Sequence, residues 1–110
     1  YNTEGAEILI VAFGIVARIC VSVIEMLKEN KKFKKKVGLI RPVTLWPFPE
    51  KEILASLKGV KKILVAEMNL GQMVEDVRLA ACGKVPVEFI GKPGGTIFTA
   101  EEIYDRIRSL

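Results

Sequence analysis

The 110-residue chain contains no histidine, which removes the side chain most often used as a general base and the usual ligand of catalytic zinc. It contains two cysteines, Cys20 and Cys82, which stand far apart and form no Cys-x-x-Cys pair. Both fall at apolar helical positions, so the sequence predicts buried free thiols. Two isolated cysteines cannot build a disulfide framework, an iron–sulfur cluster or a zinc site.

Long apolar runs and targeting signals are also missing. The longest apolar run, residues 8–16, contains Gly14 and is followed by Arg18, which leaves it well short of the roughly 20 residues that span a bilayer. Glu4 and Glu7 stand where a signal peptide has its basic segment. The sequence therefore predicts a cytoplasmic protein without a membrane segment.

The composition is that of a globular domain. Apolar residues make up 50% of the chain and charged residues 27%, and 110 residues suffice for one core but not for two. The chain opens at Tyr1, and a strand pattern begins a few residues later. We expect residues 1–110 to form a single domain that is a fragment of a longer polypeptide.

Four apolar runs rich in β-branched residues recur along the chain. They are continuous rather than alternating, which is typical of strands buried on both faces of a parallel sheet. The predicted strands are residues 8–13, 37–40, 62–68 and 87–90.

Amphipathic helical patterns alternate with these runs. We expect Pro49 to open the second helix and Gly59 to stop it, whereas the third covers residues 72–81. Thr99-Ala100-Glu101-Glu102 is a capping box that starts the last helix. The predicted buried faces are Val16, Ile19, Cys20, Val23, Ile24 and Leu27; Ile53, Leu54 and Leu57; Met73, Val74, Val77, Ala80 and Ala81; and Ile103, Ile107 and Leu110.

This alternation predicts a three-layer α/β/α fold with a mainly parallel sheet of four to five strands in the order 2-1-3-4. In such a sheet the direction of winding reverses between the first and third strands, and ligands bind outside the carboxyl ends of those strands. The loops at this switch point are residues 13–15 and 67–72.

Motifs of known chemistry are weak. The end of the first strand carries one glycine, Gly14, where a dinucleotide fingerprint needs three. Residues 91–96, Gly-Lys-Pro-Gly-Gly-Thr, lack the Gly-Lys-Ser/Thr ending of a phosphate loop, so we interpret them as a turn.

The switch-point loop after the third strand is the most polar feature of the predicted core. Residues 67–73 read Glu-Met-Asn-Leu-Gly-Gln-Met. Asn69 can cap the following helix, and Gly71 allows another backbone to approach closely. Glu67 disfavours a bare anion site unless a base such as Arg41 pairs with it. With Gln72, the cluster indicates a helix cap and protein interface, or else a small-molecule site.

Residues 41–49, Arg-Pro-Val-Thr-Leu-Trp-Pro-Phe-Pro, form a second unusual stretch. Three prolines restrict the backbone, while Trp46 and Phe48 offer the large rigid surfaces that interfaces use. Two interpretations stay open: an interface, or a lid on the core in which Arg41 satisfies nearby carbonyls.

Residues 28–36 hold most of the excess positive charge. The formal net charge is +4, and this run follows the end of a predicted helix, where cations complement the helix dipole. We interpret the run as a solvated surface. A patch for nucleic acid or an acidic partner is the alternative, although Phe33 is the one aromatic residue among the lysines.

Two long motifs in the right order resemble a known family. Residues 37–49, Val-Gly-Leu-Ile-Arg-Pro-Val-Thr-Leu-Trp-Pro-Phe-Pro, and 65–73, Val-Ala-Glu-Met-Asn-Leu-Gly-Gln-Met, closely resemble the C-terminal part of the alpha subunit of 2-oxoacid:ferredoxin oxidoreductases. Residues 12–14, 86–92 and 99–102 are also similar to that family, so the resemblance covers nearly the whole chain.

The resemblance implies the fold of the transketolase C-terminal domain, in which an extra antiparallel strand often precedes the four found here. It also implies an enzyme that converts a 2-oxoacid, coenzyme A and oxidised ferredoxin into acyl-CoA, carbon dioxide and reduced ferredoxin. The pattern is most similar to the 2-oxoglutarate or broad-specificity branch. The complete enzyme would use thiamine diphosphate, magnesium and iron–sulfur clusters, none of them held by this domain.

The implied partners are the N-terminal thiamine pyrimidine-binding domain of the same subunit and a beta subunit, with gamma and delta subunits as further candidates. We expect no nucleic acid and no membrane. Our hypothesis is a non-catalytic domain that supports assembly. The candidate surface comprises Gly14, Arg41, Trp46, Phe48, Glu67, Asn69, Gly71 and Gln72. The alternative is a small binding domain that takes a nucleotide-like ligand such as coenzyme A at the switch point, with the lysine run near its phosphates.

Overall fold

The computed structural model of the chain describes residues 3–12, 14–41, 50–55, 57–67, 77–78, 85–91 and 99–110. Val77 and Arg78 are helical and lie inside the interval predicted for the third helix, the rest of which is outside the described residues. The other elements are β1 (Ile8–Val11), α1 (Gly14–Glu29), β2 (Val37–Ile40), α2 (Glu50–Ala55), β3 (Lys62–Glu67), β4 (Val87–Gly91) and α4 (Ala100–Arg108).

The sheet has the predicted order β2-β1-β3-β4, and its described pairs are all parallel. Ile8 aligns with Val37 on one side and with Lys62 on the other, so β1 is central. The described part of the chain adds no antiparallel strand: Thr3 and Ala6 are joined by a turn hydrogen bond of 3.1 Å ahead of β1.

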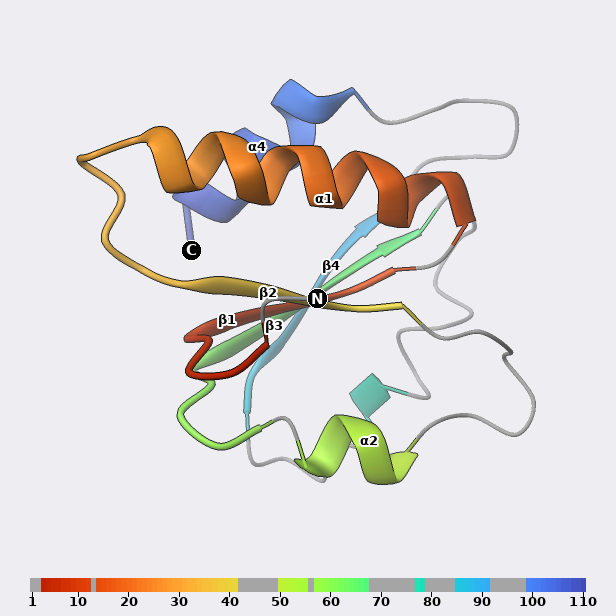
Figure 1. The fold of residues 1–110 in the computed structure, drawn as a ribbon. Coiled ribbons are helices and arrows are strands. Elements are labelled where there is room, and N and C mark those ends of the chain that lie inside the picture. The colour runs from red at the N-terminus through yellow and green to blue at the C-terminus, as the bar shows by residue number, and fades with distance from the viewer. Residues whose placement is uncertain are drawn as a thin grey trace.

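Helices cover both faces of the sheet (Figure 1). On one face, α1 and α4 pack over the side chains of Ile8 and Ile10 of β1. On the opposite face, α2 and the helical residue Val77 pack over Leu9 and Val11. Because successive residues of a strand point to opposite faces, a continuous apolar strand can feed two cores at once. The three-layer α/β/α architecture is therefore confirmed.

One outer strand, β4, is less enclosed than its apolar sequence suggests. Every residue of β1 is buried, but all five residues of β4 are partly exposed. The prediction that all four strands are buried on both faces is thus wrong for β4. β4 lies at one edge of the sheet, whereas β2, at the other edge, keeps its first three residues buried.

Two helices form where the sequence predicts them. The buried residues of α1 recur three and four positions apart: Val16, Ala17, Cys20, Val23, Ile24 and Leu27. Thr99 begins α4 with a complete capping box. Its Oγ1 accepts from the Glu102 amide at 3.2 Å, and the Glu102 Oε1 accepts from the Thr99 amide at 3.2 Å.

The end of α2 differs from the prediction. The helix ends at Ala55, so Gly59 does not stop it and Leu57 is not one of its residues. Instead, the Val60 amide donates to the Leu57 carbonyl at 2.9 Å, closing a turn in which Gly59 has φ +81°. Glycine is favoured at the third position of this turn because the backbone φ there is positive.

Strand boundaries also shift slightly. β1 ends at Val11, before the predicted end at residue 13, and β4 continues to Gly91. β3 is described to Glu67, and residue 68, its predicted end, lies outside the described residues. None of the described helices is long and apolar enough to cross a bilayer.

Candidate functional site

The carboxyl ends of β1, β2 and β3 meet at one edge of the sheet, which we call the carboxyl edge. Val11 aligns with Ile40 of β2 and with Val65 of β3. The Ala12 amide extends the ladder by donating to the Ile40 carbonyl at 3.1 Å. The chain therefore leaves all three strands within a short distance, on both sides of the predicted switch point.

Gly14 is the first residue of α1 and lies three positions after the last residue of β1. Its φ is +66°, a left-handed conformation that residues with a Cβ rarely adopt. Among the described residues, no heavy atom beyond its chain neighbours and its own helix lies within 4 Å of where a Cβ would be. Glycine is required here by the turn from strand to helix, and a side chain would meet open space.

Arg41 and Glu67 lie at the carboxyl ends of β2 and β3, the two strands that flank β1. Arg41 follows β2 and is exposed, so its guanidinium is accessible at the carboxyl edge. Glu67 is the last residue of β3 and aligns with Gly91 of β4. The direction of the Glu67 side chain is outside the described structure, so a pairing with Arg41 stays a prediction.

The remaining candidate residues lie in intervals that the structure does not describe. They are Trp46, Phe48, Asn69, Gly71 and Gln72. Of the predicted surface, the structure therefore places Gly14, Arg41 and the backbone of Glu67 at or just beyond the carboxyl ends of three adjacent strands.

Cys20 is buried in the core on α1, as predicted. Burial raises the pKa of its thiol from 9.0 to about 12, because a thiolate is poorly solvated among apolar side chains. A thiol held in this form is neither a nucleophile nor a metal ligand at neutral pH. Within the described residues, no group of three or more histidine, cysteine, aspartate or glutamate side chains could hold a metal ion. Cys82 lies outside those residues.

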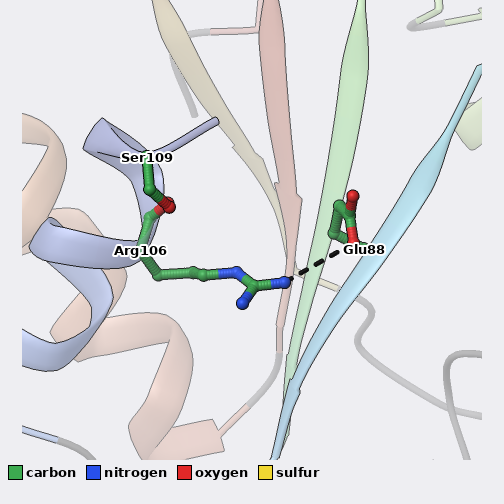
Figure 2. A network of polar contacts seen from close by, with 3 residues as sticks. All are labelled: Glu88, Arg106 and Ser109. Atoms are coloured by element: carbon green, nitrogen blue, oxygen red, sulfur yellow. Dashed lines mark hydrogen bonds and ion pairs between the residues drawn. The ribbon is translucent and has the colours of Figure 1, made fainter.

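Polar contacts between α4 and its neighbours escaped the sequence analysis. Arg106 of α4 reaches across to Glu88 of β4, with 3.5 Å between its Nη2 and the Glu88 Oε2 (Figure 2). Asn30, just after α1, donates from Nδ2 to the Tyr104 hydroxyl at 2.9 Å. Glu88, a charged residue inside an otherwise apolar strand, was the sequence signal that could have indicated the contact with Arg106. These contacts fix α4 against the sheet and α1.

The lysine run lies away from the carboxyl edge. Residues 30–36 lead from the end of α1 to the start of β2, so they lie at the amino ends of the parallel strands. Five residue steps along β2 separate Lys36 from Arg41, roughly 16 Å at 3.3 Å per residue. The expectation that the lysine run lies near the phosphates of a switch-point ligand is therefore wrong, because the topology places the two features at opposite ends of the sheet.

Comparison with known proteins connects this chain to an enzyme family. Residues 6–103 match the family described as pyruvate:ferredoxin oxidoreductase core domain II. The ketoisovalerate oxidoreductase subunit VorB of Methanothermobacter marburgensis is 36% identical over all of this chain and 30% of its own length. The 2-oxoglutarate synthase subunit KorA of Methanothermobacter thermautotrophicus is 38% identical over 96% of this chain and 27% of its own length. The chain thus spans less than a third of these relatives.

Solved structures share the fold. A 2-oxoglutarate:ferredoxin oxidoreductase from Magnetococcus marinus, solved with 2-oxoglutarate, coenzyme A and succinyl-CoA bound, has a TM-score of 0.80 and 26% identity. The match covers 94% of this chain and 18% of that one. A split-gene transketolase has a TM-score of 0.78 and 19% identity over 96% of this chain and 38% of its own, which confirms the transketolase C-terminal-like fold.

Proposed function

Because the chain belongs to the pyruvate:ferredoxin oxidoreductase core domain II family, we propose that it is the C-terminal domain of the alpha subunit of a 2-oxoacid:ferredoxin oxidoreductase. The match over residues 6–103 carries this proposal. Residues 1–110 form one domain of a longer subunit, in agreement with the 30% and 27% of the two relatives that the chain spans.

The complete enzyme decarboxylates a 2-oxoacid oxidatively to an acyl-CoA and passes the electrons to ferredoxin. Relatives named for ketoisovalerate and for 2-oxoglutarate are 36% and 38% identical to this chain, and a pyruvate synthase subunit, PorA, is 28% identical. These values support the reaction class. Within that class we propose 2-oxoglutarate or a broad range of 2-oxoacids as the substrate.

The proposed role of this domain is mechanical rather than catalytic. Thiamine diphosphate, magnesium and iron–sulfur clusters would supply the decarboxylation and electron transfer from other domains. The described residues do not fit a cluster, because Cys20 is buried with its pKa raised to about 12 and no trio of metal-ligating side chains comes together among them. No catalytic step is therefore assigned to this chain.

The carboxyl edge is the surface we assign to assembly. It exposes Arg41 beside the Gly14 turn, and the loops holding Trp46 and Asn69 leave the same ends of β2 and β3. The proposed partners are the N-terminal thiamine pyrimidine-binding domain of the same subunit and the beta subunit, with gamma and delta subunits as further candidates. The enzyme is proposed to be cytoplasmic, with ferredoxin and coenzyme A as its reaction partners.

Charge reversal at Arg41 tests this assignment in the complete enzyme. Arg41 is exposed, so Arg41→Glu should leave the melting temperature of the isolated subunit within about 2 °C of the wild type. An unpaired like charge inside an interface costs several kcal/mol, so the fraction of assembled enzyme should fall at least tenfold at low micromolar protein. Mass photometry measures the assembly, and the reduction of ferredoxin measures turnover.

Lys58→Glu is the matched control, because Lys58 is exposed in the turn before β3, at the amino ends of the strands, and makes the same change of charge away from the carboxyl edge. It should assemble and turn over normally. Trp46→Ala and Asn69→Ala extend the test to the sequence-predicted part of the surface. If Arg41→Glu and both of these variants assemble and react like the wild type, the carboxyl edge does not serve assembly.

Coenzyme A binding at the switch point is the competing function. Because the lysine run lies away from the carboxyl edge, it cannot contact phosphates bound there. Arg41 is the described cation at that edge that could do so. Calorimetric titration of the isolated domain with millimolar coenzyme A distinguishes the two functions. Heat that disappears in Arg41→Glu would favour ligand binding, whereas an absence of heat favours assembly.

A further inference from the structure

The positive charge of this chain is concentrated in one short segment. Residues 28–36 contain six lysines and one glutamate, a formal charge of +5, while the whole chain carries +4. The remaining residues therefore sum to a slight negative charge. Such a concentration produces a local positive potential, which attracts acidic partners and speeds their association.

The fold gives this segment a defined shape. At the end of α1 the Asn30 side chain accepts from the Lys32 amide at 3.0 Å, and the Asn30 carbonyl accepts from the Phe33 amide at 3.0 Å. These bonds turn the chain back toward β2. Between the last turns of α1 and the returning segment lies a groove of about 300 Å³.

The groove has an apolar floor and a basic rim. Ile24, Leu27, Phe33 and Val37 form the floor, and Lys28, Lys34, Lys35 and Lys36 form the rim. Phe33 is partly exposed, whereas the other floor residues are at least 97% buried, so Phe33 presents the accessible apolar surface. An apolar side chain flanked by negative charges would match both parts.

Three of the four rim lysines are held by contacts within the domain. Lys28 pairs with Glu25 at 3.3 Å, Lys35 donates to the Leu110 backbone oxygen at 3.3 Å, and Lys36 donates to the Glu4 carbonyl. The Glu4 carbonyl is neutral, so the charge of Lys36 is not neutralised by this contact. Among the described residues, Lys34 forms no ion pair. The rim is therefore partly ordered and still basic.

We propose that this lysine-rimmed groove docks an acidic segment of a partner protein, with one apolar side chain against Phe33 and carboxylates facing the rim. Charge complementarity selects this occupant. A nucleic acid duplex would contact the lysines through its phosphates and leave the accessible apolar surface of Phe33 without a partner. The groove lies at the amino ends of the parallel strands, so the docked segment would lie away from the carboxyl edge.

A binding measurement on the complete subunit tests the proposal independently of its reaction. The probe is a fluorescein-labelled peptide with a central leucine between glutamates, and its matched control has serine in place of the leucine. Fluorescence anisotropy should show micromolar binding of the leucine peptide at 50 mM salt and at least tenfold weaker binding at 500 mM. The serine peptide should bind at least fivefold more weakly, because the apolar contact is lost.

Charge reversal locates the binding. Lys34→Glu with Lys35→Glu should weaken peptide binding about tenfold or more, since each reversal replaces an attraction by a repulsion. Lys51→Glu with Lys58→Glu is the control with the same change of charge, and it should alter binding less than about twofold. Far-ultraviolet circular dichroism should be the same for both variants.

Several results would overturn the proposal. They are no binding of the leucine peptide, equal binding of the two peptides, an equal effect of the two charge reversals, or tighter binding of single-stranded DNA. Preferential binding to phosphatidylserine vesicles would also overturn it, in favour of a membrane surface.

Discussion

Replacing Gly14 by alanine separates a backbone requirement from a contact requirement at the carboxyl edge. Gly14 has φ +66°, and the left-handed conformation costs an L-residue about 1–2 kcal/mol. Alanine also restricts the unfolded chain, which offsets this by about 0.4–1 kcal/mol. Because a Cβ at this position meets no described atom within 4 Å, no steric cost is added. The expected net loss is about 1 kcal/mol.

Urea unfolding followed by circular dichroism measures this loss as a lower midpoint with an unchanged slope. A loss of about 1 kcal/mol corresponds to a melting temperature roughly 4–6 °C lower in a domain of this size. Gly14→Asn should lose about half as much, because asparagine tolerates the left-handed region better than alanine. Gly59→Ala is the control: its φ is +81° and a Cβ there also meets no described atom, so a similar loss is expected.

The two glycine substitutions should differ in their effect on the assembly of the complete enzyme. If a partner packs against the carboxyl edge, Gly14→Ala places a methyl group in that interface and weakens assembly, whereas Gly59→Ala lowers stability alone. An isolated domain that loses less than about 0.3 kcal/mol on Gly14→Ala would refute the conformational reasoning. A loss above about 3 kcal/mol would show that a close contact, rather than φ, requires glycine.

Three further predictions concern the core and the caps. Thr99→Ala should destabilise the chain by about 1 kcal/mol through loss of the capping box, measured by urea unfolding. Ile24→Ala should cost about 2–5 kcal/mol in the same assay, because Ile24 is 1% exposed in the core under α1. The Cys20 thiol stays protonated in the folded chain up to about pH 12 but ionises near 9.0 in the unfolded chain. Unfolding should therefore become easier as the pH rises from about 9 to about 12, by about 1.4 kcal/mol per pH unit, and the Cys20→Ala variant should lack that contribution.

Each of these has a matched control. Glu101→Ala changes the same turn as Thr99 without touching the box, so equal losses would contradict the capping argument. Ile15 is on the same helix and 45% exposed, and Ile15→Ala should cost well under 1 kcal/mol. If wild type and Cys20→Ala have the same pH dependence above pH 9, Cys20 is not held as a buried thiol. Slow alkylation of the folded chain by iodoacetamide checks the same point.

Local pattern was sufficient for most of the fold. The continuous apolar runs placed β1 to β4, the three-and-four spacing identified the buried face of α1, and Thr99 marked the start of α4. These features depend on neighbours along the chain, which a sequence displays directly. Gly59 was misassigned because a glycine after a helical pattern serves equally as a helix stop or as a turn residue, and the hydrogen bond from Val60 to Leu57 decides between them.

Features that depend on topology were harder to predict. The separation of the lysine run from Arg41 follows from the direction of β2 in the parallel sheet. The predicted alternation of strands and helices already implied this direction. The partial exposure of β4 and the pair of Glu88 and Arg106 both depend on packing between elements, which exists only in the folded chain. Of the candidate surface, the structure describes Gly14, Arg41 and the backbone of Glu67. The roles of the others remain predictions: Trp46, Phe48, Asn69, Gly71 and Gln72.

The central position of β1 has a consequence for synthesis. Among the strands of this sheet it is the first to leave the ribosome, yet its partners begin roughly 30 and 50 residues later, at Val37 and Lys62. At about 5–20 residues per second, the Ile-Leu-Ile-Val strand waits several seconds before β3 can close its second side. During that interval a fully apolar segment has unpaired backbone on the nascent chain. Until β3 is made, this unpaired strand can associate with other chains, so synthesis itself is a stage at which aggregation competes with folding.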